Sequence, residues 1–173
     1  GSTATIAELV TINAATSGTV TLSTETIAAN FSDTAANLAA AFSGITTHTG
    51  TIAITDLATI DQLTTISSVT SGTVTYTGVS DTVSNLVPGG SIHSYINSSY
   101  TVTVEDQVTL SQLNAINAAT SGAITLNVTS GTLSGTAAEL ASAFDGTITE
   151  YTGTLTATGS AANVLQAEVI FNA

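Results

Sequence analysis

The sequence feature that most constrains the fold is an internal repeat with a period near fifty residues. One pattern occurs three times, as LVTINAATSGTVTL at residues 9–22, LTTISSVTSGTVTY at residues 63–76 and LNAINAATSGAITL at residues 113–126. Its Thr-Ser-Gly triplet ends at Gly18, Gly72 and Gly122, which are 54 and 50 residues apart. Repetition of this kind predicts a row of equivalent units, each burying its apolar face against its neighbours.

A second, weaker pattern fills the rest of each repeat. It reads DTAANLAAAF at residues 33–42, DTVSNLVPGGSIHSYI at residues 81–96 and GTAAELASAF at residues 135–144. An alternating segment follows each copy, at residues 51–55, 101–104 and 154–158, so that each repeat reads helix, strand, helix, strand. We therefore expect a single solenoid domain over residues 1–173, with repeats at residues 5–56, 57–106 and 107–159 and a partial fourth unit at residues 160–173.

One leucine per expected helix gives a finer period. The positions are Leu9, Leu38, Leu63, Leu86, Leu113, Leu140 and Leu165, and their spacings are 29, 25, 23, 27, 27 and 25 residues. Each repeat is thus expected to contain two coils of about 26 residues, each with one helix and one strand, a size within the range of leucine-rich solenoids.

Local sequence signals mark where the helices begin and end. Threonine followed three residues later by Glu or Gln predicts a capping box, and this pattern occurs at Thr5, Thr59, Thr109 and Thr136. Asp33 and Asp81 are expected to cap two further helices. Gly18, Gly72 and Gly122 are expected to end the first helix of each repeat in the left-handed conformation. The Pro88-Gly89-Gly90 sequence predicts a break in the second helix of the middle repeat.

The strand segments alternate apolar residues with threonine, as in Val20 and Leu22 or Val102 and Val104. Because a helix is expected between successive strands, neighbouring strands should be parallel and their connections right-handed. The predicted fold class is α/β, a right-handed solenoid of helix-strand coils with one parallel β-sheet.

The charge balance excludes several classes of function. The 173 residues include no Lys or Arg and twelve Asp plus Glu, for a formal net charge of −12. Nucleic-acid binding draws its affinity from clustered basic side chains, so we expect no nucleic-acid partner. No apolar run approaches the roughly 18 residues that span a bilayer, so we expect no membrane insertion. The absence of cysteine excludes disulfides and thiolate metal sites.

The sequence offers no recognisable catalytic group. Its two histidines, His48 and His93, lie in no catalytic motif and at non-equivalent places in the repeat, and we expect both to be loop or exposed residues. A repeated fold also places equivalent residues in rows, whereas catalysis needs unlike groups converging in a pocket. We therefore expect that the protein is not an enzyme.

Four acidic residues near strand-to-helix turns form the candidate metal site: Asp56, Asp61, Glu105 and Asp106. Calcium binds clustered oxygen ligands of this kind, although the spacing of a known calcium loop is missing. The alternative is that these carboxylates lie at helix starts and complement the helix dipole. No cofactor is expected, and calcium remains open.

The threonines of the strand segments form the candidate ligand face. They are Thr19, Thr21, Thr51, Thr55, Thr73, Thr75, Thr77, Thr101, Thr103, Thr125, Thr154 and Thr156. Aligned across one sheet, they would make a flat array of hydroxyl and methyl groups about 4.8 Å apart, which is similar to the ice-binding face of solenoidal antifreeze proteins. Tyr76, Tyr100 and Tyr151 lie in or beside strands and could stack against sugars or pack at the rim. The alternative is that threonine is a good uncharged residue for an exposed sheet face.

The motif INAATSG at residues 12–18 and 116–122, together with GTAAELASAF at residues 135–144, resembles repeats of very large Thr/Ser/Ala-rich surface proteins of marine cyanobacteria and other aquatic bacteria. The resemblance covers nearly the whole chain and implies a secreted or cell-surface location, with a role as a spacer, adhesin stalk, surface layer or filament. The expected partners are neighbouring repeats of the same polypeptide, with end-to-end self-association of the fragment. The alternative function is a module that binds ice or a glycan through its threonine face.

Overall fold

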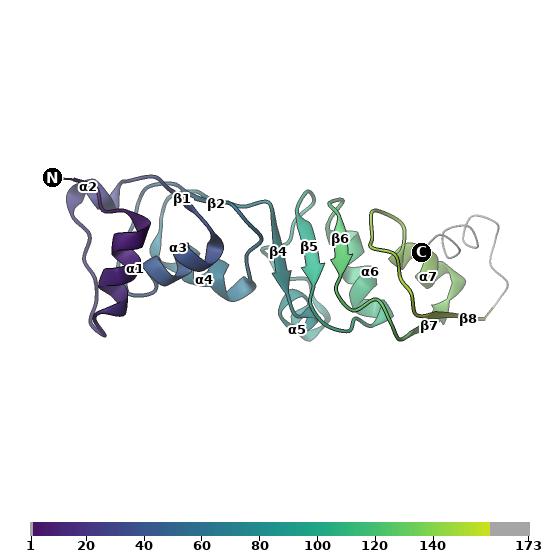
Figure 1. The fold of residues 1–173 in the computed structure, drawn as a ribbon. Helices are drawn as coiled ribbons and strands as arrows, with labels where there is room; N and C mark the ends of the chain where they lie inside the picture. The colour runs from purple at the N-terminus through teal and green to yellow at the C-terminus, as the bar shows by residue number, and fades with distance from the viewer. Residues whose placement is uncertain (1, 160–173) are drawn as a thin grey trace. The chain divides into compact units, whose positions relative to one another are not determined.

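The computed structural model describes residues 2–159, so the partial fourth unit at residues 160–173, with its expected helix and Leu165, lies outside the described residues. The chain divides into two compact parts, residues 1–78 and residues 79–173. Each part contains short helices that alternate with short parallel strands (Figure 1).

Apart from α2, which the repeat pattern does not predict, the helices of the described residues form where that pattern places them. They are α1 (Ile6–Ala14), α2 (Thr24–Ile27), α3 (Ala35–Phe42), α4 (Ile60–Val69), α5 (Val83–Leu86), α6 (Leu110–Ala119) and α7 (Ala137–Ala143), with a 3-10 turn η1 (Pro88–Gly90) after α5. All four predicted capping boxes are confirmed, at Thr5, Thr59, Thr109 and Thr136. The break at Pro88 is also confirmed, because α5 ends at Leu86 and both Gly89 and Gly90 have positive φ.

The predicted end of three helices in left-handed glycine is wrong. Gly18, Gly72 and Gly122 all lack a positive φ. Asp33 and Asp81 are also not the caps themselves, because each is the last residue of a strand, and the threonine that follows it is the N-cap residue. Their carboxylates accept hydrogen bonds from the backbone N–H of Thr34 and Thr82 instead.

The strands are short and every pairing among those given is parallel. They are β1 (Phe31–Asp33), β2 (Ile52–Ile54), β3 (Val74–Thr75), β4 (Gly78–Asp81), β5 (Thr101–Val104), β6 (Ile124–Leu126), β7 (Thr132–Thr136) and β8 (Thr154–Thr158). They form three separate sheets in the orders β1-β2-β3, β4-β5-β6 and β7-β8. In register, Ile52 lies beside Phe31 and Val74, and Val102 lies beside Ile124.

The predicted solenoid with one parallel sheet is therefore wrong. The reason lies in two connections that contain no helix: β3 leads directly to β4, and β6 leads directly to β7. At each of these two places the second strand joins a new sheet instead of extending the old one. The architecture is α/β with three small parallel sheets, none of them closed. Nothing in it supports the surface-adhesin role that accompanied the solenoid prediction.

The apolar core of each part follows the equivalent leucines. Leu9, Leu38, Leu63, Leu86, Leu113 and Leu140 are all buried. The inward residues of the strands, including Ile52, Ile54, Val102 and Val104, complete these cores. The leucine spacing thus identifies the core-facing position of each helix.

Candidate functional site

In the second and third repeats, the Thr-Ser-Gly triplet joins its half-repeat, that is, one helix with its strand, to the half-repeat before it. The Thr70 hydroxyl lies 3.3 Å from the carbonyl oxygen of Gly50, and the Thr120 hydroxyl donates to that of Tyr100. The next residue adds a backbone bond, because Ser71 N donates to His48 O and Ser121 N donates to Ser98 O, both at 3.0 Å. The two triplets therefore form equivalent hydrogen-bonded edges in the two parts of the chain.

The glycine of the triplet is required by close backbone approach. A Cβ on Gly72 would lie 1.9 Å from Gly50 O, and one on Gly122 would lie 2.4 Å from Tyr100 O. Gly50 itself meets Ala29 O in the same way, at 1.9 Å. In each triplet the glycine N–H donates to the threonine hydroxyl oxygen, at 3.0 Å, 3.1 Å and 2.9 Å for Gly18, Gly72 and Gly122. The sequence showed this motif clearly, but its contacts with another half-repeat could not be seen in it.

Two of the candidate metal ligands bind helix starts of the preceding half-repeat. Asp56 accepts from the first N–H of α3, that of Ala35, at 2.7 Å, and Asp106 accepts from that of α5, Val83, at 2.6 Å. Negative charge at a helix N-terminus is favourable because the helix dipole is positive there. The helix-start alternative thus describes Asp56 and Asp106 correctly, with the difference that each carboxylate caps a neighbour's helix.

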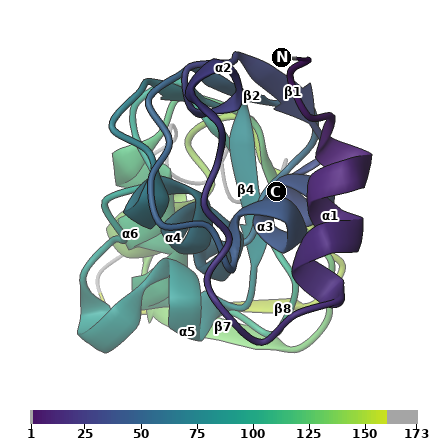
Figure 2. The same ribbon diagram turned by 90° about the vertical axis from the view of Figure 1, so that its left-hand side faces the viewer.

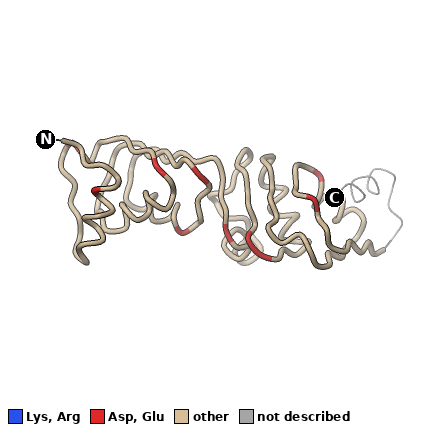
Figure 3. The backbone as a smooth tube through the Cα atoms, viewed as in Figure 1, with Lys and Arg blue, Asp and Glu red and all other residues tan. Residues whose placement is uncertain are grey.

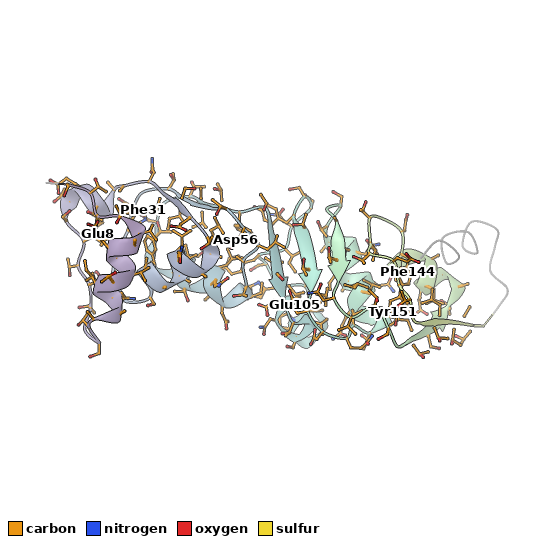
Figure 4. The ribbon with its side chains drawn as sticks, viewed as in Figure 1. Glu8, Phe31, Asp56, Glu105, Phe144 and Tyr151 are labelled. Carbon is orange, nitrogen blue, oxygen red and sulfur yellow. The ribbon has the colours of Figure 1, made fainter. Side chains whose placement is uncertain are left out.

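The other two candidate ligands do not join them. Asp61 lies in the first turn of α4, and Glu105 binds Ser80 and Asn127 through its carboxylate. Asp56 and Glu105 come from different parts of the chain (Figure 4). Within residues 2–159 no group of three or more His, Cys, Asp or Glu is placed to hold a metal ion. The acidic residues are scattered along the chain, as Figure 3 shows for the described residues.

Asparagine side chains on the first helix of two repeats make further hydrogen bonds between one half-repeat and the next. Asn13 donates to Ala40 O of α3 at 2.7 Å, and Asn117 donates to Ser142 O of α7 at 2.8 Å. Asn13 and Asn117 are equivalent residues of the INAATSG motif. Each contact joins a helix to a helix of the next half-repeat, whereas the triplet contacts the preceding half-repeat.

His48 lies in the connection between α3 and β2, as predicted for a loop residue, but it is fully buried, so the expectation that it is exposed is wrong. Its ring packs against those of Phe31 and Phe42, with centroids 5.4 Å and 5.1 Å away. Nε2 lies 2.9 Å from Ala29 O and Nδ1 lies 3.0 Å from the Thr70 hydroxyl, so both nitrogens are engaged. Burial lowers the pKa of His48 below its ordinary value of 6.5, and the hydrogen bond to Ala29 O opposes this shift.

Tyr151 occupies the equivalent position in the third repeat, since ITTHTG at residues 45–50 aligns with ITEYTG at residues 148–153. Its ring is buried beside Phe144, with centroids 5.9 Å apart, and its hydroxyl donates to Ser130 O at 3.3 Å (Figure 4). His48 and Tyr151 therefore perform the same task, which is to fill an aromatic core and bind a carbonyl of the preceding half-repeat. His93 is half-buried and stacks on Tyr95.

The candidate threonine face is divided among the three sheets. Its twelve threonines are exposed except Thr101 and Thr103, which are half-buried. Thr75 lies beside Ala53, so hydroxyls do not continue across the first sheet. Thr103 pairs with Thr125 in the second sheet, and Thr154 and Thr156 pair with Thr132 and Ser134 in the third. The hydroxyls form short rows, and Thr132 and Ser134 were missed because their segment breaks the Thr-x-Thr pattern.

Comparisons with protein-family models, with curated proteins and with solved structures find no match to this chain. Among the described residues, no helix is both long enough and apolar enough to cross a membrane.

Proposed function

We propose that this chain is a structural tandem-repeat module of a larger protein. The length of that protein would be determined by the number of repeats, each of about fifty residues. The observation that carries the proposal is the set of equivalent hydrogen bonds between half-repeats. Thr70 and Thr120, Ser71 and Ser121, and Asp56 and Asp106 bind the preceding half-repeat through the same atoms. A chain whose contacts recur in this way can be lengthened by adding repeats, because each repeat needs only its neighbours.

The proposed role requires no catalytic residue, cofactor or ligand. It also suits the composition, since a surface with no Lys or Arg and a net charge of −12 keeps separate molecules apart through mutual repulsion. A secreted or cell-surface location stays a prediction, as does the resemblance on which it rests.

Duplication of one repeat tests the proposal. Residues 57–106 would be inserted a second time after Asp106, which keeps the order of helices and strands. We expect a folded protein whose urea m-value rises with the added buried surface and whose unfolding midpoint does not fall. The control is the same insertion with its residues shuffled. Loss of cooperative unfolding with the true repeat, to the level of the shuffled control, would contradict the proposal.

A ligand-binding module remains the second candidate because of one observation in the third sheet. There Thr132 pairs with Thr154 and Ser134 pairs with Thr156, all four with exposed side chains. Thermal hysteresis and a glycan array test this candidate, with Thr154→Glu as the disabling variant and Thr19→Glu as the control. Activity lost in Thr154→Glu and kept in Thr19→Glu would support it; no activity in the unmodified chain would reject it.

A further inference from the structure

Ile12 on α1 is exposed, whereas its internal equivalents in the repeat are buried. Ile12, Ile66 and Ile116 are the same residue of the repeat, in INAATSG, ISSVTSG and INAATSG. Ile66 and Ile116 are 0% exposed, whereas Ile12 is 47% exposed. In Figure 2, which views the chain from the left-hand side of Figure 1, α1 lies in front of α3 and α4.

The position of Ile12 on the helix identifies what is missing. Asn13, on one side of the buried Leu9, binds the following helix α3. Ile12 lies on the other side of Leu9, since consecutive residues are 100° apart around a helix. Helices α4 and α6, in which the equivalent isoleucines are buried, each contact an element that precedes them, α3 and η1 respectively. Ile12 is therefore exposed because α1 has no such neighbour in the described chain.

The first Thr-Ser-Gly triplet independently indicates that a neighbouring half-repeat is missing beside α1 among the described residues. A Cβ on Gly18 would meet only the Thr16 hydroxyl, at 3.4 Å, whereas one on Gly72 would strike a carbonyl at 1.9 Å. Thr16 still accepts from Gly18 N, as its equivalents do. Among the described residues, however, Thr16 and Ser17 have no carbonyl acceptor in the positions of Gly50 O and His48 O. Glycine is thus present at Gly18 although, within residues 2–159, no backbone of another half-repeat approaches it.

We infer that Ile12 and residues 16–18, with the shallow apolar groove beside them, form a docking face for a second copy of this chain. This groove, of about 500 Å³, is lined by Ser2, Ala4, Ala7, Glu8, Thr11 and Ile12. The inference rests on the proposed function, because it extends the contact between repeats to separate molecules.

The segment of the second copy that fits is residues 148–155, and α1 would there take the place that the repeat pattern assigns to residues 160–173 of that copy. Tyr151 and Gly153 are the sequence equivalents of His48 and Gly50, whose carbonyls accept from Ser71 and Thr70. Tyr151 O and Gly153 O of the second copy would then accept from Ser17 N and the Thr16 hydroxyl, and the Gly18 backbone would pass close to Gly153 O. The two surfaces differ, so the contact is head-to-tail and propagates into an open chain of molecules.

Sedimentation velocity of the full chain tests this inference up to about 1 mM, in high salt to screen the repulsion between copies. We expect the sedimentation coefficient of the unmodified chain to rise with concentration. Ile12→Asp and Gly18→Ala should each abolish the rise, and Gly18→Ala should do so with an unchanged circular dichroism spectrum. Leu57→Asp is the matched control, because Leu57 is a second large apolar residue that is exposed, at 38%, among residues 2–159. This variant should associate normally.

Disulfide trapping tests the partner segment, since the chain has no cysteine of its own. His48 pairs with Thr70, so Ser71 lies opposite Thr49, and the equivalent pair between copies is Ser17 with Thr152. A mixture of Ser17→Cys and Thr152→Cys proteins should form the mixed disulfide at least tenfold faster than Ser17→Cys with Ser84→Cys.

A strictly monomeric unmodified chain, equal association of all four proteins, or equal trapping rates would overturn the inference. Successful insertion of a second copy of residues 57–106 alongside any of these results would leave the proposed function standing and reject only the docking face.

Discussion

At the scale of single residues, His48 and Tyr151 show that two repeats keep the same environment and the same contacts at equivalent positions. They differ in chemistry, yet each is buried beside a phenylalanine and binds a carbonyl of the preceding half-repeat. The sequence predicted neither role, because the alignment that pairs them lies in the weak part of the repeat and burial depends on distant residues. Only the histidine can take up a proton near neutral pH.

The first prediction concerns the pH dependence that His48 creates. Its pKa is lowered in the folded chain, so below about pH 6.5 the unfolded chain binds a proton that the folded chain does not. The free energy of unfolding should therefore fall as the pH drops from about 7 to 5. His48→Tyr, which copies Tyr151, should fold and remove this slope in urea titrations at each pH.

Glu8 and Glu139, whose carboxylates cap helices, lose their stabilising effect at lower pH. They therefore do not contribute to the slope expected from His48. The backbone N–H of Thr5 lowers the pKa of Glu8, and that of Thr136 does the same for Glu139, so both titrate below 4.5. Their stabilisation is present above that pH and is lost as the pH falls through their folded pKa values. An undiminished slope between about pH 7 and 5 in His48→Tyr would contradict the account.

The second prediction concerns the glycine of the triplet. Gly72→Ala should reduce the free energy of unfolding by about 2–4 kcal/mol, because its Cβ would force apart two backbones that are in contact. Gly18→Ala should change the stability of the monomer by less than about 1 kcal/mol, since its Cβ has room. Urea unfolding of both variants at micromolar concentration measures the difference. Equal effects would show that the triplets are not in the environments described.

At the scale of elements, helix starts were predictable because their signals are local. The capping boxes at Thr5 and Thr136 need only residues three apart, and both form as expected. Asp56 and Asp106 could not be assigned in this way, because each caps a helix 21 or 23 residues earlier in the chain. Their proximity to those helices is set by strand pairing, which the sequence indicates only as a pattern.

The third prediction compares these two distant caps. Helix α3 also has its own cap, since the Thr34 hydroxyl accepts from Asn37 N, whereas Thr82 makes no such bond at the start of α5. Asp106→Ala should therefore cost about 1–2 kcal/mol of stability and accelerate amide exchange of Val83. Asp56→Ala should cost less and serves as the matched control. A larger loss in Asp56→Ala would contradict the assignment of Asp106 as the main cap of α5.

At the scale of the whole molecule, parallel pairing was predictable and the division into sheets was not. Helices between most strands dictate parallel neighbours. The direct connections from β3 to β4 and from β6 to β7 end one sheet and begin another, and no residue in the sequence marks them as different from an ordinary loop. The threonine face was expected to be continuous for the same reason, and it is divided where the sheets are.

The fourth prediction follows from the charge of the whole chain. With no Lys or Arg, added salt has almost no side-chain ion pairs to weaken, and it screens repulsion among the acidic residues. The unfolding temperature should therefore rise when NaCl increases from about 10 mM to about 0.5 M. A fall in thermal melts at micromolar protein would mean that attractive charge interactions dominate.

The central claim is that equivalent residues of the repeat bind the preceding half-repeat through equivalent atoms. Amide hydrogen exchange of Ser17, Ser71 and Ser121 in dilute monomer tests it most directly. Because Ser71 N and Ser121 N each donate to a carbonyl of the preceding half-repeat, both should be strongly protected, whereas Ser17 should exchange at nearly the rate of an unstructured peptide. Fast exchange at Ser71 and Ser121, or equal protection at all three serines, would contradict the claim.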